Sequence, residues 1–187
     1  FHSQRNGNFD VWIKRLDGMV GSEELLVGTP DNEWPLDWSR DGRFLLYLRT
    51  DQNYASSDLW VLPMTGSNRE AIVVANTPFE ERLGQFSPDG RWMAYETNES
   101  GRREIVVQAF PASSAPVHIS TSGGVAPRWS ADGKEIYFVA PDGKMTSDRP
   151  MPSTPAERHS LSFHAIMRSS PPPQFARHPG PSANGSQ

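Results

Sequence analysis

The stretch Phe86-Ser-Pro-Asp-Gly-Arg-Trp-Met-Ala-Tyr95 decides the fold of this chain, because it has two close counterparts. These counterparts are Trp38-Ser-Arg-Asp-Gly-Arg43 and Trp129-Ser-Ala-Asp-Gly-Lys134. Asp-Gly between apolar runs is a strong hairpin signal, because Gly accepts a positive φ and Asp bonds its own backbone. The leading aromatic residues are 48 and 43 residues apart, which indicates a repeated β unit.

A second strand pattern recurs between these turns and keeps nearly the same period. Its acidic first residues, Asp10, Asp58 and Glu104, are 48 and 46 residues apart, and each begins a short apolar run. The stretch 70–75 supplies a further strand. Four antiparallel strands in a repeat of about 45 residues are typical of a β-propeller blade. The sequence therefore predicts an all-β fold, a partial β-propeller of four-stranded antiparallel blades.

The repeats of residues 1–145 predict an arc of blades rather than a ring. Residues 9–29 give the last two strands of one blade, 34–75 and 83–120 give full blades, and 126–145 open another. Closed propellers have about four to eight blades, and these segments amount to about three. Because an open arc leaves apolar faces in water, we expect the remaining blades of a parent protein as partners.

Residues 146–187 differ in composition from the rest of the chain. They hold eight of the 17 prolines, no tryptophan and no lysine, and four arginines against two acidic residues. A segment this poor in clustered apolar residues cannot bury enough surface to offset the entropy of ordering. The sequence therefore predicts a proline-rich, disordered tail. Two origins stay open for it: a native linker, or the product of a frameshift.

The repeat resembles the TolB-like, WD-repeat-like propeller family of bacteria. The family hallmark is Trp/Phe-Ser-Pro-Asp-Gly-Lys/Arg before an apolar strand; residues 86–91 match it throughout, and the two counterparts depart only at the proline. Residues 91–95, 105–111 and 133–138 are most similar to the C-terminal propellers of bacterial transmembrane serine/threonine protein kinases. The same propeller type occurs in TolB and in prolyl-oligopeptidase-like peptidases, so the fold alone does not decide the function.

The resemblance implies a non-catalytic protein-interaction or sensor module of a larger bacterial protein, with a serine/threonine kinase as the expected parent. The alternatives are the gating propeller of a prolyl-oligopeptidase-like serine peptidase and a TolB-type periplasmic scaffold. The chain lacks the kinase motifs and the Gly-x-Ser-x-Gly motif of hydrolases, so we expect no enzyme activity from this segment. We expect it on the extracytoplasmic side of a membrane-anchored parent, with a cytoplasmic location left open.

Charge and residue usage exclude several classes of function. The net charge of −4, from 18 basic and 22 acidic residues, argues against a strongly basic nucleic-acid binder. The absence of cysteine excludes disulfides, thiol catalysis and cysteine-ligated zinc. No apolar run approaches the roughly 20 residues of a membrane span. We therefore expect no cofactor, no metal, no nucleic acid and no membrane contact by this segment, but a protein or small-ligand partner.

The candidate site residues come directly before the repeated aromatic residues: Asp37, Gln85 and Arg128. Strand alternation predicts that Asp37 points away from the face that carries Trp34 and Trp38. The family resemblance implies that the first strand of each blade lines a central channel, where these polar groups would meet a ligand or merely water. The expected residues of the adjoining rim are Glu33, Glu80, Glu81 and Arg82.

Overall fold

The computed structural model describes residues 1–17, 21–67, 69–111 and 115–148, and the chain is all-β within them. Every regular element in these ranges is a strand, and the strands form four antiparallel sheets. No helix with the length and apolar character to cross a membrane occurs in these ranges. The predicted all-β class is confirmed.

The four sheets follow one another along the chain, and neighbouring strands in each sheet are consecutive in sequence. The first sheet has the order β1-β2-β3, the second β4-β5-β6-β7, the third β8-β9-β10-β11 and the fourth β12-β13-β14. The bounds are β1 (His2–Ser3), β2 (Asp10–Lys14), β3 (Glu23–Val27), β4 (Asn32–Trp38), β5 (Phe44–Thr50), β6 (Ser57–Pro63), β7 (Ile72–Ala75), β8 (Glu81–Phe86), β9 (Trp92–Thr97), β10 (Glu104–Ala109), β11 (Val117–His118), β12 (Val125–Trp129), β13 (Ile136–Val139) and β14 (Met145–Asp148).

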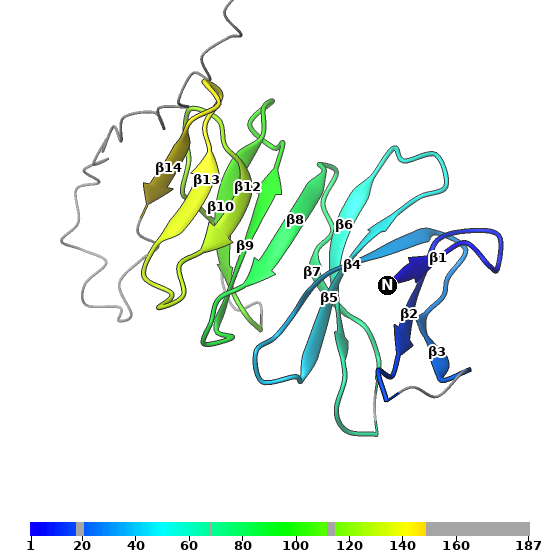
Figure 1. The fold of residues 1–187 in the computed structure, drawn as a ribbon. Coiled ribbons are helices and arrows are strands. Elements are labelled where there is room, and N and C mark those ends of the chain that lie inside the picture. Colours follow the sequence, from blue (N-terminus) through cyan, green and yellow to red (C-terminus); the bar gives the residue numbers. More distant parts are fainter. Residues whose placement is uncertain (18–20, 68, 112–114, 149–187) are drawn as a thin grey trace, which may run out of the picture.

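The sheets stand side by side as successive blades of an arc, with β1–β3 at one end and β12–β14 at the other (Figure 1). The first strands meet along the arc, since β4 contacts β8 and β8 contacts β12. The strands β7 and β11 lie at the opposite edges of their sheets. The second, third and fourth sheets are therefore antiparallel meanders that begin at the inner edge of the arc.

Two sheet boundaries differ from the sequence prediction. The first sheet has a third strand, β1, because His2 and Ser3 pair with Val11 and Asp10; residues 9–29 therefore supply only part of it. The last strand extends to Asp148, past the predicted boundary at residue 145, because Met145–Asp148 pair with β13. Residues 149–187, which make up nearly all of the predicted tail, lie outside the described residues.

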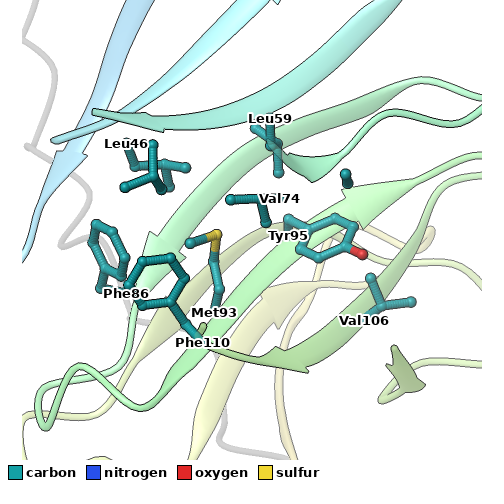
Figure 2. Packing of buried hydrophobic residues seen from close by; sticks show 10 residues of the cluster. Leu46, Leu59, Val74, Phe86, Met93, Tyr95, Val106 and Phe110 are labelled. Atoms are coloured by element: carbon teal, nitrogen blue, oxygen red, sulfur yellow. The ribbon is translucent and has the colours of Figure 1, made fainter. Parts of the chain in front are cut away.

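Within the described residues, the hydrophobic core forms three clusters, and each lies between neighbouring sheets. In the largest, Leu46 and Leu59 of the second sheet face Met93 and Tyr95 of the third (Figure 2). The other two clusters join the first sheet to the second, around Tyr47, and the third to the fourth, around residue 136. Because the apolar surface is buried between blades, each blade depends on its neighbours for stability.

Three Asp-Gly turns that begin with serine, 39–44, 87–92 and 130–135, close with the same hydrogen bonds. In the first, the Ser39 hydroxyl donates to Asp41 (2.7 Å) and accepts from the backbone N–H of Phe44 (2.9 Å). Gly42 has φ of 75°, where a side chain is strained. Hydrogen bonds from Ser39 and from the Arg43 backbone lower the pKa of Asp41 to about 2. These aspartates stabilise the turns, as predicted.

Candidate binding surface along the first strands

The first strands of three sheets carry the predicted site residues, and each strand is interrupted at the same place. Pairing shifts register between Pro35 and Asp37 in β4, between Arg82 and Gln85 in β8, and between Val125 and Arg128 in β12. A β-bulge redirects the side chains that follow it. Simple alternation therefore does not describe β4, and the predicted placement of Asp37 opposite Trp34 and Trp38 does not follow from it.

Asp37 links two blades. Its Oδ2 accepts a hydrogen bond from the backbone N–H of Phe86 in the next sheet (2.8 Å), and its Oδ1 accepts from the N–H of Trp38 (2.9 Å). Both carboxylate oxygens thus bind backbone of the first strands β4 and β8. The side chain is half-buried at this junction. In this structure Asp37 aligns neighbouring blades at the inner edge of the arc.

Gln85 and Arg128 are placed differently from Asp37. The backbone carbonyl of Gln85 accepts from the indole N–H of Trp129 (3.3 Å), which joins β8 to β12. The guanidinium of Arg128 is exposed and donates to the carbonyl of Pro127 (2.8 Å). Among the described residues, no hydrogen bond or ion pair connects the side chains of Asp37, Gln85 and Arg128. They lie at equivalent positions of three adjacent strands without forming one cluster.

Two of the predicted rim residues are buried. Glu33 is 0% exposed and Glu81 is 2% exposed, at the beginning of β4 and β8 respectively. Each carboxylate accepts a hydrogen bond from a threonine hydroxyl four residues earlier, Thr29 for the first and Thr77 for the second. Burial raises the pKa of both carboxyl groups. Glu33 and Glu81 therefore belong to the blade junctions and offer little to a ligand at the rim.

The two buried glutamates each lie near an acidic residue of the preceding sheet. The charge of Asp10 adds to the raised pKa of Glu33, and the charge of Asp58 adds to that of Glu81. Burial also raises the pKa of Asp58. Three carboxyl oxygens of these groups, Glu33 Oε2, Asp58 Oδ1 and Glu81 Oε2, are buried without a hydrogen-bond partner in the described part of the chain. A neutral, protonated carboxyl group suits such an environment better than a carboxylate.

The other two rim residues are accessible. Glu80 is half-buried and forms an ion pair with Arg103 (2.5 Å), whose guanidinium also lies 3.6 Å from Glu96. Arg82 is exposed and pairs in register with Glu96 across β8 and β9. Along the first strands, Arg82 and Arg128 are thus exposed, whereas Gln85 and Asp37 are half-buried. Within residues 1–148, apart from the short gaps in their description, no group of three or more acidic, histidine or cysteine side chains could hold a metal ion.

We expect Glu81→Gln to raise the free energy of unfolding at pH 7 by about 1 kcal/mol, because glutamine avoids the cost of either burying a carboxylate or protonating it at this pH. The folded pKa of Glu81 lies above its ordinary value of 4.5, so the stability from its protonation is complete below pH 4.5 and is lost as the pH rises through the folded pKa. Wild-type protein should therefore gain stability from this group between pH 7 and pH 5, and the variant should not. Urea unfolding at both pH values measures the difference.

Glu24→Gln is the matched control, because Glu24 is exposed on β3 of the first sheet and does not affect the pKa of Glu81. It should leave the stability at pH 7 within a few tenths of a kcal/mol, as expected for a surface change. A loss of stability in Glu81→Gln at pH 7 would mean that the ionised carboxylate stabilises the junction, contrary to the expectation.

No family model matches the chain. The chain is 35% identical over 66 residues to the Tol-Pal system protein TolB of Rhizorhabdus wittichii, and 33% identical over 66 residues to that of Zymomonas mobilis. Each match covers 35% of this chain and 14% of the relative. The chain therefore matches only a small part of the length of these curated relatives.

Solved structures give the same fold over more of the chain. The chain superposes on TolB of Agrobacterium tumefaciens with a TM-score of 0.61 and 20% identity, covering 74% of this chain and 48% of that one. For TolB of Acinetobacter baumannii the TM-score is 0.59 at 18% identity, with 78% and 36% covered. A prolyl endopeptidase gives a TM-score of 0.54 at 11% identity, with 72% and 20% covered. The chain has the TolB-like β-propeller fold.

Proposed function

We propose that this chain is part of a β-propeller that binds a protein partner through its first strands and catalyses no reaction itself. The observation that carries the proposal is the alignment of β4, β8 and β12, which contact one another in turn and share a bulge. Arg82 and Arg128 are exposed on these strands, and Gln85 is half-buried. Well-spaced polar groups on a rigid sheet edge suit a polypeptide surface. The two TolB relatives are named as proteins of the Tol-Pal system, which fits a protein that binds other proteins.

The proposal includes a parent protein on the extracytoplasmic side of a membrane. The resemblance of residues 91–95, 105–111 and 133–138 to kinase propellers supports a membrane-anchored serine/threonine kinase as that parent. The second candidate is the gating propeller of a prolyl-oligopeptidase-like peptidase, which the likeness to a prolyl endopeptidase favours. The flanking gene sequence distinguishes them. A kinase domain with an apolar span of about 20 residues supports the first, and a Gly-x-Ser-x-Gly hydrolase domain supports the second.

Site-specific photo-crosslinking in the native host tests the binding surface. A photoreactive amino acid in place of Arg82 or of Arg128, in the full-length parent, should give a covalent adduct with one and the same protein. His118 provides the matched control, because it is exposed on β11 at the opposite edge of its sheet. Mass spectrometry of the adducts identifies the partner.

Two outcomes would overturn the proposed surface. Adducts that form equally well from position 118 would show that the first strands are not the contact, and an absence of any protein adduct from positions 82 and 128 would show that no protein binds there. Purified protein that phosphorylates or cleaves a substrate above background, with this segment supplying the reacting groups, would contradict the non-catalytic assignment.

A further inference from the structure

A polar hollow of about 440 Å³ opens between the loops of the first two sheets, and none of the predicted site residues lines it. Three loops meet there: residues 4–9 between β1 and β2, residues 28–31 between β3 and β4, and residues 51–56 between β5 and β6. Five carboxamide side chains contribute to its lining, together with one tyrosine: Gln4, Asn6, Asn8, Asn32, Gln52 and Tyr54. No charged side chain belongs to this lining.

Hydrogen bonds to the protein fix the orientation of three of these carboxamides. The amide nitrogen of Asn6 donates to Asp10 (2.8 Å), that of Asn8 to the carbonyl of Thr29 (2.8 Å), and that of Gln52 to the carbonyl of Pro30 (2.8 Å). Among the described residues, no hydrogen bond uses the side-chain oxygens of these three residues. Since a carboxamide accepts on the side opposite its donors, each can offer a fixed acceptor to a bound molecule.

Tyr54 presents an exposed aromatic ring at the edge of the hollow. It is 59% exposed, and its ring centroid lies 5.8 Å from that of Trp34, which continues the row of rings to Phe9 (5.4 Å). Its φ of 59° lies in the left-handed region, which is unusual for a bulky residue. Asp51 maintains this conformation, because its carbonyl accepts from Tyr54 N–H (3.1 Å) and its carboxylate from Ala55 N–H (2.7 Å). Strain of this kind clusters at binding sites.

The negative charge behind the lining disfavours an anionic ligand. The carboxylate of Asp10 is 2% exposed and accepts from both Asn6 and Asn8, so negative charge lies directly behind the carboxamides. An anionic ligand would meet this charge without a basic side chain in the lining to compensate for it. Fixed acceptors beside an open aromatic ring suit a molecule with many hydroxyl donors and an apolar ring face. We propose that this hollow, at Tyr54 and the surrounding carboxamides, binds a neutral saccharide unit.

Calorimetric titration of the full chain with maltohexaose, cellohexaose, xylohexaose and chitohexaose tests the proposal. At least one of these neutral oligosaccharides should bind. Polygalacturonate, which is also a chain of linked sugar rings but carries carboxylates, should bind more weakly. Tyr54→Gly should weaken binding about tenfold, because the stacking ring is lost. It should not lower the thermal stability, because glycine is unstrained at this φ.

Two further variants separate a binding role from a structural one. Gln4→Ala should weaken binding about threefold by removing one hydrogen bond, without a change in folding. Phe79→Ala is the matched control, because Phe79 is 37% exposed in the loop before β8 and does not line the hollow; it should leave binding unchanged. Failure of all four neutral oligosaccharides to bind the folded chain would overturn the proposal. Binding that Tyr54→Gly does not weaken, or a preference for polygalacturonate, would overturn it equally.

Discussion

Replacing Leu59 by alanine should lower the free energy of unfolding by about 3–5 kcal/mol, the largest effect we expect from a single apolar substitution in this chain. Leu59 is 0% exposed in β6 and lies between the second and third sheets, where it belongs to the same cluster as Leu46 and Met93 (Figure 2). The backbone of β8 passes close to it, since a Cβ added to Gly84 would lie 3.2 Å from Leu59 Cδ1. Backbone hydrogen bonds within each sheet hold both sheets in place. The sheets therefore cannot move together to fill the cavity that Leu59→Ala would leave.

Urea unfolding followed by circular dichroism measures this loss. Ile72→Ala supplies the control, because Ile72 is 39% exposed on the edge strand β7 of the same sheet. It should cost less than about 1 kcal/mol, as is usual for an exposed position. If Leu59→Ala cost no more than Ile72→Ala, the packing of neighbouring blades would not be the main source of stability.

The second large effect is expected for Glu104→Ala, which should cost about 3 kcal/mol. Glu104 is 1% exposed at the start of β10 and binds three groups. Its carboxylate accepts from Arg102 Nε (2.6 Å), from the Ser120 hydroxyl, and from the Gly123 backbone N–H (3.0 Å). Removing it leaves the hydroxyl and the buried N–H without their acceptor. The loop before β12 should lose its attachment to the third sheet.

The pH dependence distinguishes this carboxylate from Glu81. Burial opposes ionisation of Glu104, but the hydrogen bonds from Arg102, Ser120 and Gly123 outweigh it and lower the pKa. Its contribution is therefore complete above its ordinary pKa of 4.5 and is lost as the pH falls through the lower folded pKa. The stability difference between wild type and Glu104→Ala should shrink below pH 4.5. Glu104→Gln, which keeps one acceptor, should lie between the two at pH 7. An undiminished difference at pH 3 would show that packing, and not charge, is lost.

The strands with strong local signals were predictable from sequence, and those held by their neighbours were not. The hairpins at Asp41, Asp89 and Asp132 follow from turn chemistry that lies within a few consecutive residues. The strand β1 has only two residues, and β14 has the sequence MTSD, so neither shows apolar alternation. Both form because a neighbouring strand, β2 or β13, offers its open edge. Pairing of this kind is a property of the folded sheet.

The candidate site was predictable only in part, for similar reasons. Asp37, Gln85 and Arg128 do occupy equivalent positions, but their side-chain directions depend on bulges that arise from pairing with the second strand. One sequence feature does indicate the burial of Glu33 and Glu81: in two repeats, the glutamate follows a threonine by four residues. The hollow at Tyr54 draws its lining from three loops that are up to 50 residues apart, and only the fold brings them together.

The local closure of the Asp-Gly turn at Ser39–Phe44 bears on how a repeated chain can arise by duplication. The hydrogen bonds of Ser39 and Asp41 close within six consecutive residues, from Ser39 to Phe44, and those of the matching serines and aspartates close within 87–92 and 130–135. A gene segment that encodes one turn and its two strands can therefore be duplicated without any compensating change elsewhere. The remaining residues of each copy are then free to diverge, provided that they still pack against the adjacent blade. The similarity among the repeats of this chain is accordingly greatest in these turns.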